Sequence, residues 1–364
     1  MGHESDHPST EEGHVTVDNG PEVRVTHPNL RFQARDHYER HVARLRGTLP
    51  EADAPAVRIY EVSPRDGLQN ESVVVPAEAK VALVRQLADA GVRDIEVTSF
   101  VKPSWIPQLA DAKVVLAGLR DLFEHDDLRL WALIPNRRGL ERALDADVRH
   151  IATFMSASET HNKKNLNRTR RESLAGLSEV IGTAKDSGQT VRAYLSTVFG
   201  CPYEGDVSID DTVALTLDLM GLGADEIALG DTTGMGNPGQ VVEVVRRLTE
   251  AGVPVERIAL HMHDTRGTAL ANVLAGYQVG VRTFDGSVAG VGGCPYAKGA
   301  SGNAASDDLV HLFEAMGVST GIDIDRLASA GVFLANHLGR ELPGRYHRYH
   351  VGACADDDAQ SQTA

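Results

Sequence analysis

The chain has 364 residues, 42% of them hydrophobic and 24% charged, with a formal net charge of −15 at pH 7. This composition allows a large buried core, excludes global disorder, and argues against nucleic acid or an anionic membrane surface as a partner. Three cysteines, no apolar run of membrane-spanning length and no signal-peptide pattern predict a cytoplasmic protein.

The first 54 residues are predicted to be an extension of the folded domain. Residues 1–28 are polar and rich in His, Glu, Pro and Gly, which is typical of disorder. Scattered apolar residues among Arg and His predict one helix at 33–45.

From residue 55 onward, short apolar runs alternate with helix-like segments. Several of the helix-like segments end at a glycine, which is a common helix C-cap before the next strand. The eight predicted strands begin near Val57, Asp94, Leu128, Val148, Val191, Glu226, Ile258 and Thr283. Predicted helices between them include 78–90, 209–222, 239–251 and 269–280.

This alternation predicts a parallel sheet covered by helices. Eight units in about 230 residues favour a closed (β/α)8 TIM barrel, an α/β fold, over an open doubly wound sheet. The open sheet usually carries a glycine-rich phosphate turn after its first strand, and the first strand here ends in Arg65-Asp66-Gly67 instead. We assign residues 55–338 to the barrel and 339–364 to a short flexible C-terminal tail.

Polar residues gather at the carboxyl ends of the first two predicted strands. Asp66 could cap the turn before Gly67, and Arg65 could form a surface ion pair of little energetic value. Glu96 lies inside an otherwise apolar strand and needs a partner once buried, for which Arg65 is the natural choice.

The sixth and seventh strands end in the same way. Asp231 could be an N-cap for the next helix. His261 and His263 are two residues apart on one strand, so both imidazoles face the same side. Such a pair can offer two neutral nitrogens to a divalent metal, although either His could also be structural.

After the eighth strand comes a glycine-rich segment, residues 290–302, followed by Asn303. It lacks the GK[ST] of a phosphate-binding loop, so it is either a flexible connection or a lid that carries Cys294 to the substrate. Cys294 could equally be structural, and Asn303 could cap the following helix.

Because catalytic groups of TIM barrels lie at the carboxyl ends of the strands, all these residues are expected to converge on one rim. Asp66, His261, His263 and Asn303 would supply one carboxylate, two imidazoles and an amide oxygen. Mixed oxygen and nitrogen ligation without thiolate suits Mg²⁺ or Mn²⁺.

Residues 57–338 resemble the 3-hydroxy-3-methylglutaryl-CoA (HMG-CoA) lyases, metal-dependent TIM barrels. The resemblance rests on strings spread over the barrel: EVSPRDGLQNE (61–71), IEVTSFV (95–101), FGCPYEG (199–205), LGDTTGMG (229–236), HMHDTRGTALAN (261–272) and VAGVGGCPYAKGASGNAASDDLV (288–310). It implies cleavage of an acyl-CoA, HMG-CoA, to acetoacetate and acetyl-CoA.

The resemblance also implies roles for the candidate residues. Asp66, His261, His263 and Asn303 correspond to metal ligands, and Arg65 to the group that neutralises the thioester oxygen. Glu96 resembles the carboxylate that pairs with that arginine, Asp231 and His261 the proton-transfer residues, and Cys294 the reactive cysteine of the lid.

Two departures from the family pattern concern the substrate. The extension before residue 55 is longer than usual, and residues 156–165 change the middle of a family motif. Two alternatives therefore stand beside the first: a lyase for a larger branched 3-hydroxyglutaryl-CoA, and a condensing synthase of the isopropylmalate or citramalate type. About 26 residues after Leu338 are too few for the regulatory domain of such synthases.

A catalytically silent barrel acting as a scaffold is disfavoured because every candidate group is present. We expect a homo-oligomer, a dimer as the simplest form, with no nucleic-acid or membrane partner.

Overall fold

The computed structural model describes residues 57–293 and 302–361, and the side chains of the last helix only as far as residue 353. The chain divides into two units, Met1–Ala54 and Pro55–Ala364, and the described residues all belong to the second. The predicted helix at 33–45 lies outside the described residues, as does Cys294.

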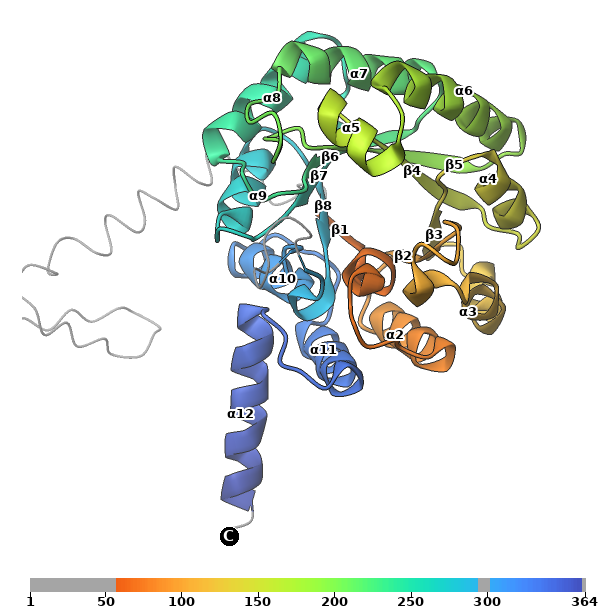
Figure 1. The fold of residues 1–364 in the computed structure, drawn as a ribbon. Coiled ribbons are helices and arrows are strands. Elements are labelled where there is room, and N and C mark those ends of the chain that lie inside the picture. The colour runs from red at the N-terminus through yellow and green to blue at the C-terminus, as the bar shows by residue number, and fades with distance from the viewer. Residues whose placement is uncertain (1–56, 294–301, 362–364) are drawn as a thin grey trace, which may run out of the picture. The chain divides into compact units, whose positions relative to one another are not determined.

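Eight parallel strands close into a barrel in which each strand pairs with its neighbours in chain order and β8 returns to β1. All eight predicted strands are confirmed, and so is the (β/α)8 fold (Figure 1). The strands are β1 (Arg58–Glu61), β2 (Asp94–Ser99), β3 (Arg129–Leu133), β4 (His150–Ser156), β5 (Thr190–Ser196), β6 (Glu226–Asp231), β7 (Ile258–Met262) and β8 (Thr283–Gly286).

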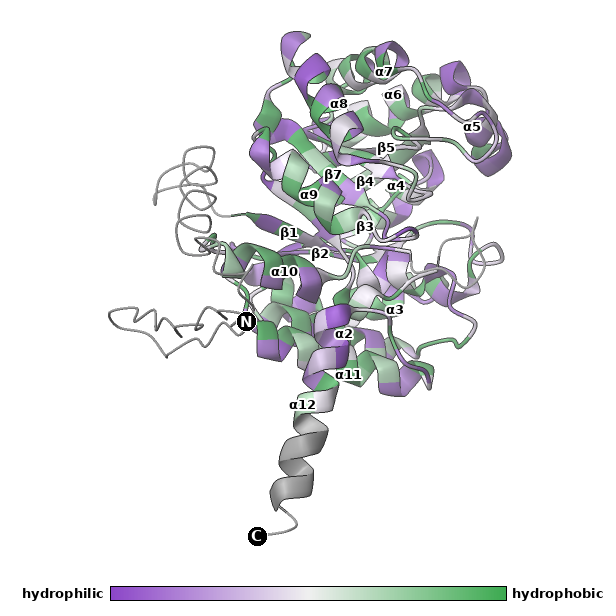
Figure 2. Ribbon diagram, turned by 90° about the vertical axis from the view of Figure 1, so that its left-hand side faces the viewer, coloured by the Kyte–Doolittle hydropathy of each residue, from purple (hydrophilic) through white to green (hydrophobic). Residues whose placement is uncertain are grey.

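Helices surround this barrel and carry both hydrophilic and hydrophobic residues, as Figure 2 shows by colour. Their apolar stripes face the strands, as expected of amphipathic helices in an outer layer. They are α2 (Ala77–Asp89), α3 (Ala112–Gly118), α4 (Arg137–Leu144), α5 (Glu159–Leu166), α6 (Arg170–Asp186), α7 (Ile209–Gly221), α8 (Pro238–Glu250), α9 (Ala269–Gln278), α10 (Ser306–Ala315) and α11 (Ile324–Leu338). One further helix, α12 (Arg345–Ser361), lies outside this layer (Figure 2).

The glycines predicted to end helices do so in the left-handed region. Gly91, Gly252 and Gly280 have φ values of 101°, 91° and 104°. At Gly91 a Cβ atom would also lie 2.3 Å from the carbonyl oxygen of Gly321, so only glycine fits there.

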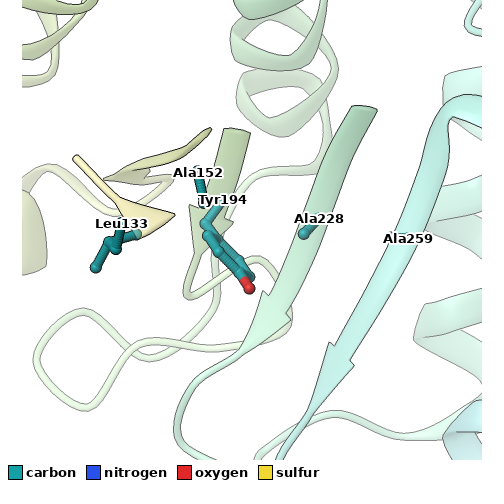
Figure 3. Packing of buried hydrophobic residues seen from close by; sticks show 5 residues of the cluster. All are labelled: Leu133, Ala152, Tyr194, Ala228 and Ala259. Carbon is teal, nitrogen blue, oxygen red and sulfur yellow. The ribbon is translucent and has the colours of Figure 1, made fainter. Parts of the chain in front are cut away.

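Part of the barrel interior is apolar. Leu133, Ala152, Tyr194, Ala228 and Ala259, from five successive strands, form one buried cluster. Figure 3 shows the Tyr194 ring extending between Leu133 and the alanines, with its hydroxyl at the far end. The alanines leave room for a ring inside the barrel, and its hydroxyl reaches the polar residues described below.

The segment after Leu338, for which the sequence predicts a flexible tail, instead contains helix α12, which points away from the barrel (Figure 2). Its first turn is tied to α10, because Asp307 accepts a hydrogen bond from the backbone N of His347 (2.8 Å) and Asp308 accepts one from that of Tyr346 (2.7 Å). Carboxylates at a helix N-terminus satisfy its free N–H groups. They come from another helix, so local sequence around α12 gives no sign of them.

Gly286 allows β8 and α10 to approach closely, and its replacement tests this packing. A Cβ atom at position 286 would lie 2.5 Å from Ser306 Oγ and 2.9 Å from Ser306 Cα. We expect Gly286→Ala to destabilise the fold by about 1–3 kcal/mol through overpacking, seen as a lower melting temperature.

Gly182→Ala is the matched control, because Gly182 lies inside α6 and no neighbouring atom comes within 4 Å of the place that a Cβ atom would take. It should stabilise the protein by about 0.4–1 kcal/mol. Equal melting temperatures for the two variants would contradict the packing argument.

Candidate metal centre and active site

The end of β7 places two imidazoles together. His261 and His263 are both buried, and their Nε2 atoms lie 3.2 Å apart. The other ring nitrogen of His261, Nδ1, lies 3.0 Å from Oδ2 of Asp285 on β8. Burial, together with the neighbouring His261, lowers the pKa of His263 to about 3, so that ring is neutral at pH 7. A neutral imidazole is the form that binds a metal.

Asp66 joins the histidines from a π-helical turn, Ser63–Gly67, that follows β1. The turn is closed by a hydrogen bond from the Gly67 N to the Val62 carbonyl (3.1 Å), and turns of this type are common at functional sites. Burial alone would raise the pKa of Asp66, but Arg65 and then the histidines hold it well below its usual range. The carboxylate is therefore ionised and available as a ligand.

Asn303 lies beside Asp66 and the two histidines because residues 302–304 pair with the end of β7. The Asp264 N donates to the Gly302 carbonyl (2.7 Å), and the Ala304 N donates to that of Met262 (3.0 Å). The side-chain amide of Asn303 donates to Asp66 Oδ2 at 3.0 Å.

The backbone on both sides of residues 294–301 is joined as well. The Gly302 N donates to the Gly292 carbonyl at 3.1 Å. A Cβ atom on Gly302 would lie 3.0 Å from that oxygen, so a larger residue would crowd the backbone at this position.

These residues fit a divalent cation. One ligand atom from each of Asp66, His261 and His263 lies within 4.8 Å of the others, so that among the described residues these three could together hold a metal ion. Asn303 Oδ1 is buried and, within the described part of the chain, has no hydrogen-bond partner. An unsatisfied buried oxygen beside a carboxylate and two facing imidazoles is what a bound cation would satisfy.

Arg65 and Glu96 form the ion pair that the sequence suggests. Arg65 Nε bonds to Glu96 Oε1, and Arg65 Nη1 bonds to Asp66. The second oxygen of Glu96 accepts from the hydroxyls of Tyr60 (2.9 Å) and Tyr194 (2.8 Å). Burial opposes the charge on Arg65, but Glu96 and Asp66 outweigh it and raise the Arg65 pKa. The guanidinium is thus a fixed positive charge next to the candidate metal site.

Asp231 lies at the same rim but is turned into its own loop. Its two oxygens accept hydrogen bonds from the backbone N atoms of Met235 (2.9 Å) and Gly236 (3.0 Å). Burial raises its pKa, and it is not among the residues that line the pocket described next. The N-cap of α8 is Asn237, so Asp231 is not the helix cap that was its alternative.

Asn303 is not the cap of the following helix either, because α10 begins at Ser306 with Ala305 as its N-cap. Neither residue is explained by helix capping.

A pocket of about 770 Å³ opens over the cluster, large enough for a sizeable ligand. Arg65, Asp66, His261 and His263 line it together with Tyr194. Its outer part is lined by basic and aromatic side chains, namely Lys102, Trp105, Arg138 and Arg142. Positive charge at the pocket gives a protein of net charge −15 a local site for an anionic substrate.

Sequence reasoning missed several polar residues inside the barrel, among them Tyr60, Arg192, Tyr194, Glu226 and Asp285. Two of these residues could have been found by the argument used for Glu96, namely that a charged residue inside an apolar strand needs a buried partner. They are Arg192 in VRAYLSTV and Asp285 in TFDGSV.

A closed parallel barrel with two histidines and a carboxylate at the carboxyl ends of its strands defines a class, the metal-dependent TIM-barrel enzymes. The chain belongs to the HMGL-like family, whose model matches residues 56–333.

Named relatives agree. The chain is 48% identical over 289 residues to a hydroxymethylglutaryl-CoA lyase of Bacillus subtilis, covering 79% of this chain and 95% of the relative. It is 43% identical to the cytoplasmic 3-hydroxy-3-methylglutaryl-CoA lyase of Mus musculus, covering 78% and 82%.

A solved HMG-CoA lyase of Acinetobacter baumannii, in complex with coenzyme A and 3-methylmalate, superposes with a TM-score of 0.76 at 40% identity and covers 82% of this chain and 96% of that one. Separately, no helix within the described residues has the length and apolar character needed to cross a membrane.

Proposed function

We propose that this protein cleaves HMG-CoA to acetoacetate and acetyl-CoA with a divalent cation, Mg²⁺ or Mn²⁺. The observation that carries the proposal is the meeting of Asp66, His261, His263 and Asn303 beside the buried guanidinium of Arg65. Relatives at 43–48% identity over most of the chain bear lyase names.

In this mechanism the four ligand residues would hold the cation, and the bound cation would make the tertiary hydroxyl of the substrate far more acidic. The hydroxyl proton leaves, the C2–C3 bond breaks, and its electron pair moves into the enolate of acetyl-CoA. Arg65 would stabilise the enolate oxygen, because its charge is buried and already oriented by Glu96. A proton delivered to C2 then completes acetyl-CoA.

For the base, the geometry favours Asp231 over His261. His261 has Nδ1 on Asp285 and Nε2 directed at His263, so as a ligand it keeps no nitrogen for proton transfer. Burial raises the pKa of Asp231 and makes its carboxylate more basic. Because Asp231 does not line the pocket, the proton would reach it through one bridging water. Cys294 is the candidate acid for the enolate carbon.

The test is acetoacetate release from HMG-CoA by the full-length protein, before and after chelation and after Mg²⁺ or Mn²⁺ is restored. Activity that chelation abolishes and metal restores is expected. A larger branched 3-hydroxyglutaryl-CoA, assayed alongside, should turn over more slowly.

Turnover of that thioester alone would replace the proposed substrate. CoA release from acetyl-CoA plus a 2-oxo acid, without HMG-CoA cleavage, would establish the synthase alternative. The cytoplasmic location and the dimer stay predictions of the sequence.

A further inference from the structure

A buried ion-pair chain runs through the barrel interior to one of the histidines. Arg192 on β5 is fully buried, and its guanidinium bonds to Glu226 on β6 (2.5 Å) and to Oδ1 of Asp285 on β8. The other oxygen of Asp285 lies 3.0 Å from His261 Nδ1. Three strands therefore contribute to holding a single imidazole.

The contact with Asp285 decides which ring nitrogen of His261 carries the proton. An ionised carboxylate only accepts hydrogen bonds, so His261 Nδ1 must donate to it. Nε2 is then left with its lone pair directed toward His263 and Asp66. His263 offers a contrast within the same site, since its Nδ1 has no hydrogen-bond partner among the described residues.

Arg192 in turn fixes Asp285. Its guanidinium lies 3.8 Å from the ring centroid of Tyr60 and 5.1 Å from that of Tyr194, so aromatic rings confine it while its two terminal nitrogens bind the carboxylates. A planar fork that spans Glu226 and Asp285 sets the direction of both.

We infer that Asp285 and Arg192 are positioning residues for the metal centre, Asp285 by orienting His261 and Arg192 by orienting Asp285. The inference rests on the proposed function only in that the cluster binds a divalent cation. Carboxylates behind metal-bound histidines typically change metal affinity about 10- to 100-fold.

The experiment measures the Mn²⁺ dissociation constant of the full-length protein by electron paramagnetic resonance of free Mn²⁺, a readout independent of turnover. Asp285→Asn should raise this constant about 10- to 100-fold. Arg192→Lys keeps the charge but cannot span both carboxylates, so a smaller rise is expected.

Asp94→Asn is the matched control. Asp94 is also a fully buried barrel carboxylate bonded to arginine, through Arg129 (2.7 and 2.6 Å). Arg58 links it to Glu226, so Asp94 belongs to the same buried network as Arg192 but contacts neither Asp285 nor a candidate ligand. Asp94→Asn should lower the melting temperature about as much as Asp285→Asn does. Its Mn²⁺ dissociation constant should stay within about twofold of the wild-type value.

If the Mn²⁺ dissociation constant is unchanged in Asp285→Asn, or rises as much in Asp94→Asn, the positioning role of Asp285 is overturned. The proposed metal site itself would not be affected by either result. If Asp285→Asn does not fold, unchanged affinity in Arg192→Lys overturns that role instead. A wild-type protein that binds no Mn²⁺ would overturn the metal site and this inference together.

Discussion

Replacing Arg65 with glutamine should lower kcat about 10²- to 10³-fold and leave KM nearly unchanged, because the lost contact is made mainly in the transition state. In the structure the guanidinium is almost completely buried and anchored by Glu96 and Asp66, so it needs no reorganisation when charge develops on the enolate oxygen. Steady-state kinetics of HMG-CoA cleavage at saturating metal would measure this.

The control is the double variant Arg65→Gln with Glu96→Gln. Removing Arg65 alone leaves Glu96 buried with the hydroxyls of Tyr60 and Tyr194 as its remaining partners among the described residues, and an uncompensated buried charge destabilises a fold. The double variant removes that charge. Recovery of kcat there would show that the single change acted through the orphaned carboxylate, and an unaltered kcat in the single variant would take Arg65 out of the mechanism.

His263→Ala should lose metal and activity together. Its Nε2 faces that of His261 at 3.2 Å, so alanine removes one of four proposed ligands and leaves water in its place. The Mn²⁺ dissociation constant should rise more than about 100-fold, beyond the range typical of residues behind the ligands. Activity should fall by orders of magnitude, since the cation contributes several kcal/mol to the transition state.

His150→Ala serves as the control for removing a barrel histidine. His150 packs against Trp131 in a tilted arrangement, with ring centroids 5.1 Å apart, and is not part of the candidate metal cluster. It should keep wild-type Mn²⁺ affinity. Normal turnover by His263→Ala after chelation would refute its assignment as a ligand.

The barrel could be predicted because its strands are apolar runs that alternate with helix-like segments, several of which end at a glycine, and this information is local in sequence. The site followed from topology: once the sheet is parallel and closed, Asp66, His261 and Asn303 must lie at the same rim. The inference holds however far apart these residues lie in the sequence.

What could not be predicted depends on contacts across the barrel. Which carboxylate meets Arg192 and which meets Arg65 depends on the register of strands far apart in sequence. Helix α12 shows the same limit, since its first turn is bonded to Asp307 and Asp308 of α10. The prediction of a tail considered only the composition of the final residues.

The hydrogen bond between Gly302 and Gly292 holds the backbone next to Asn303, a candidate metal ligand, independently of residues 294–301. Gly292 and Gly302 are bonded to each other, and Gly302 is also bonded to Asp264, just after β7. The number of residues between Gly292 and Gly302 can therefore vary without moving Asn303, whose position depends on the backbone hydrogen bonds of Gly302 and Ala304.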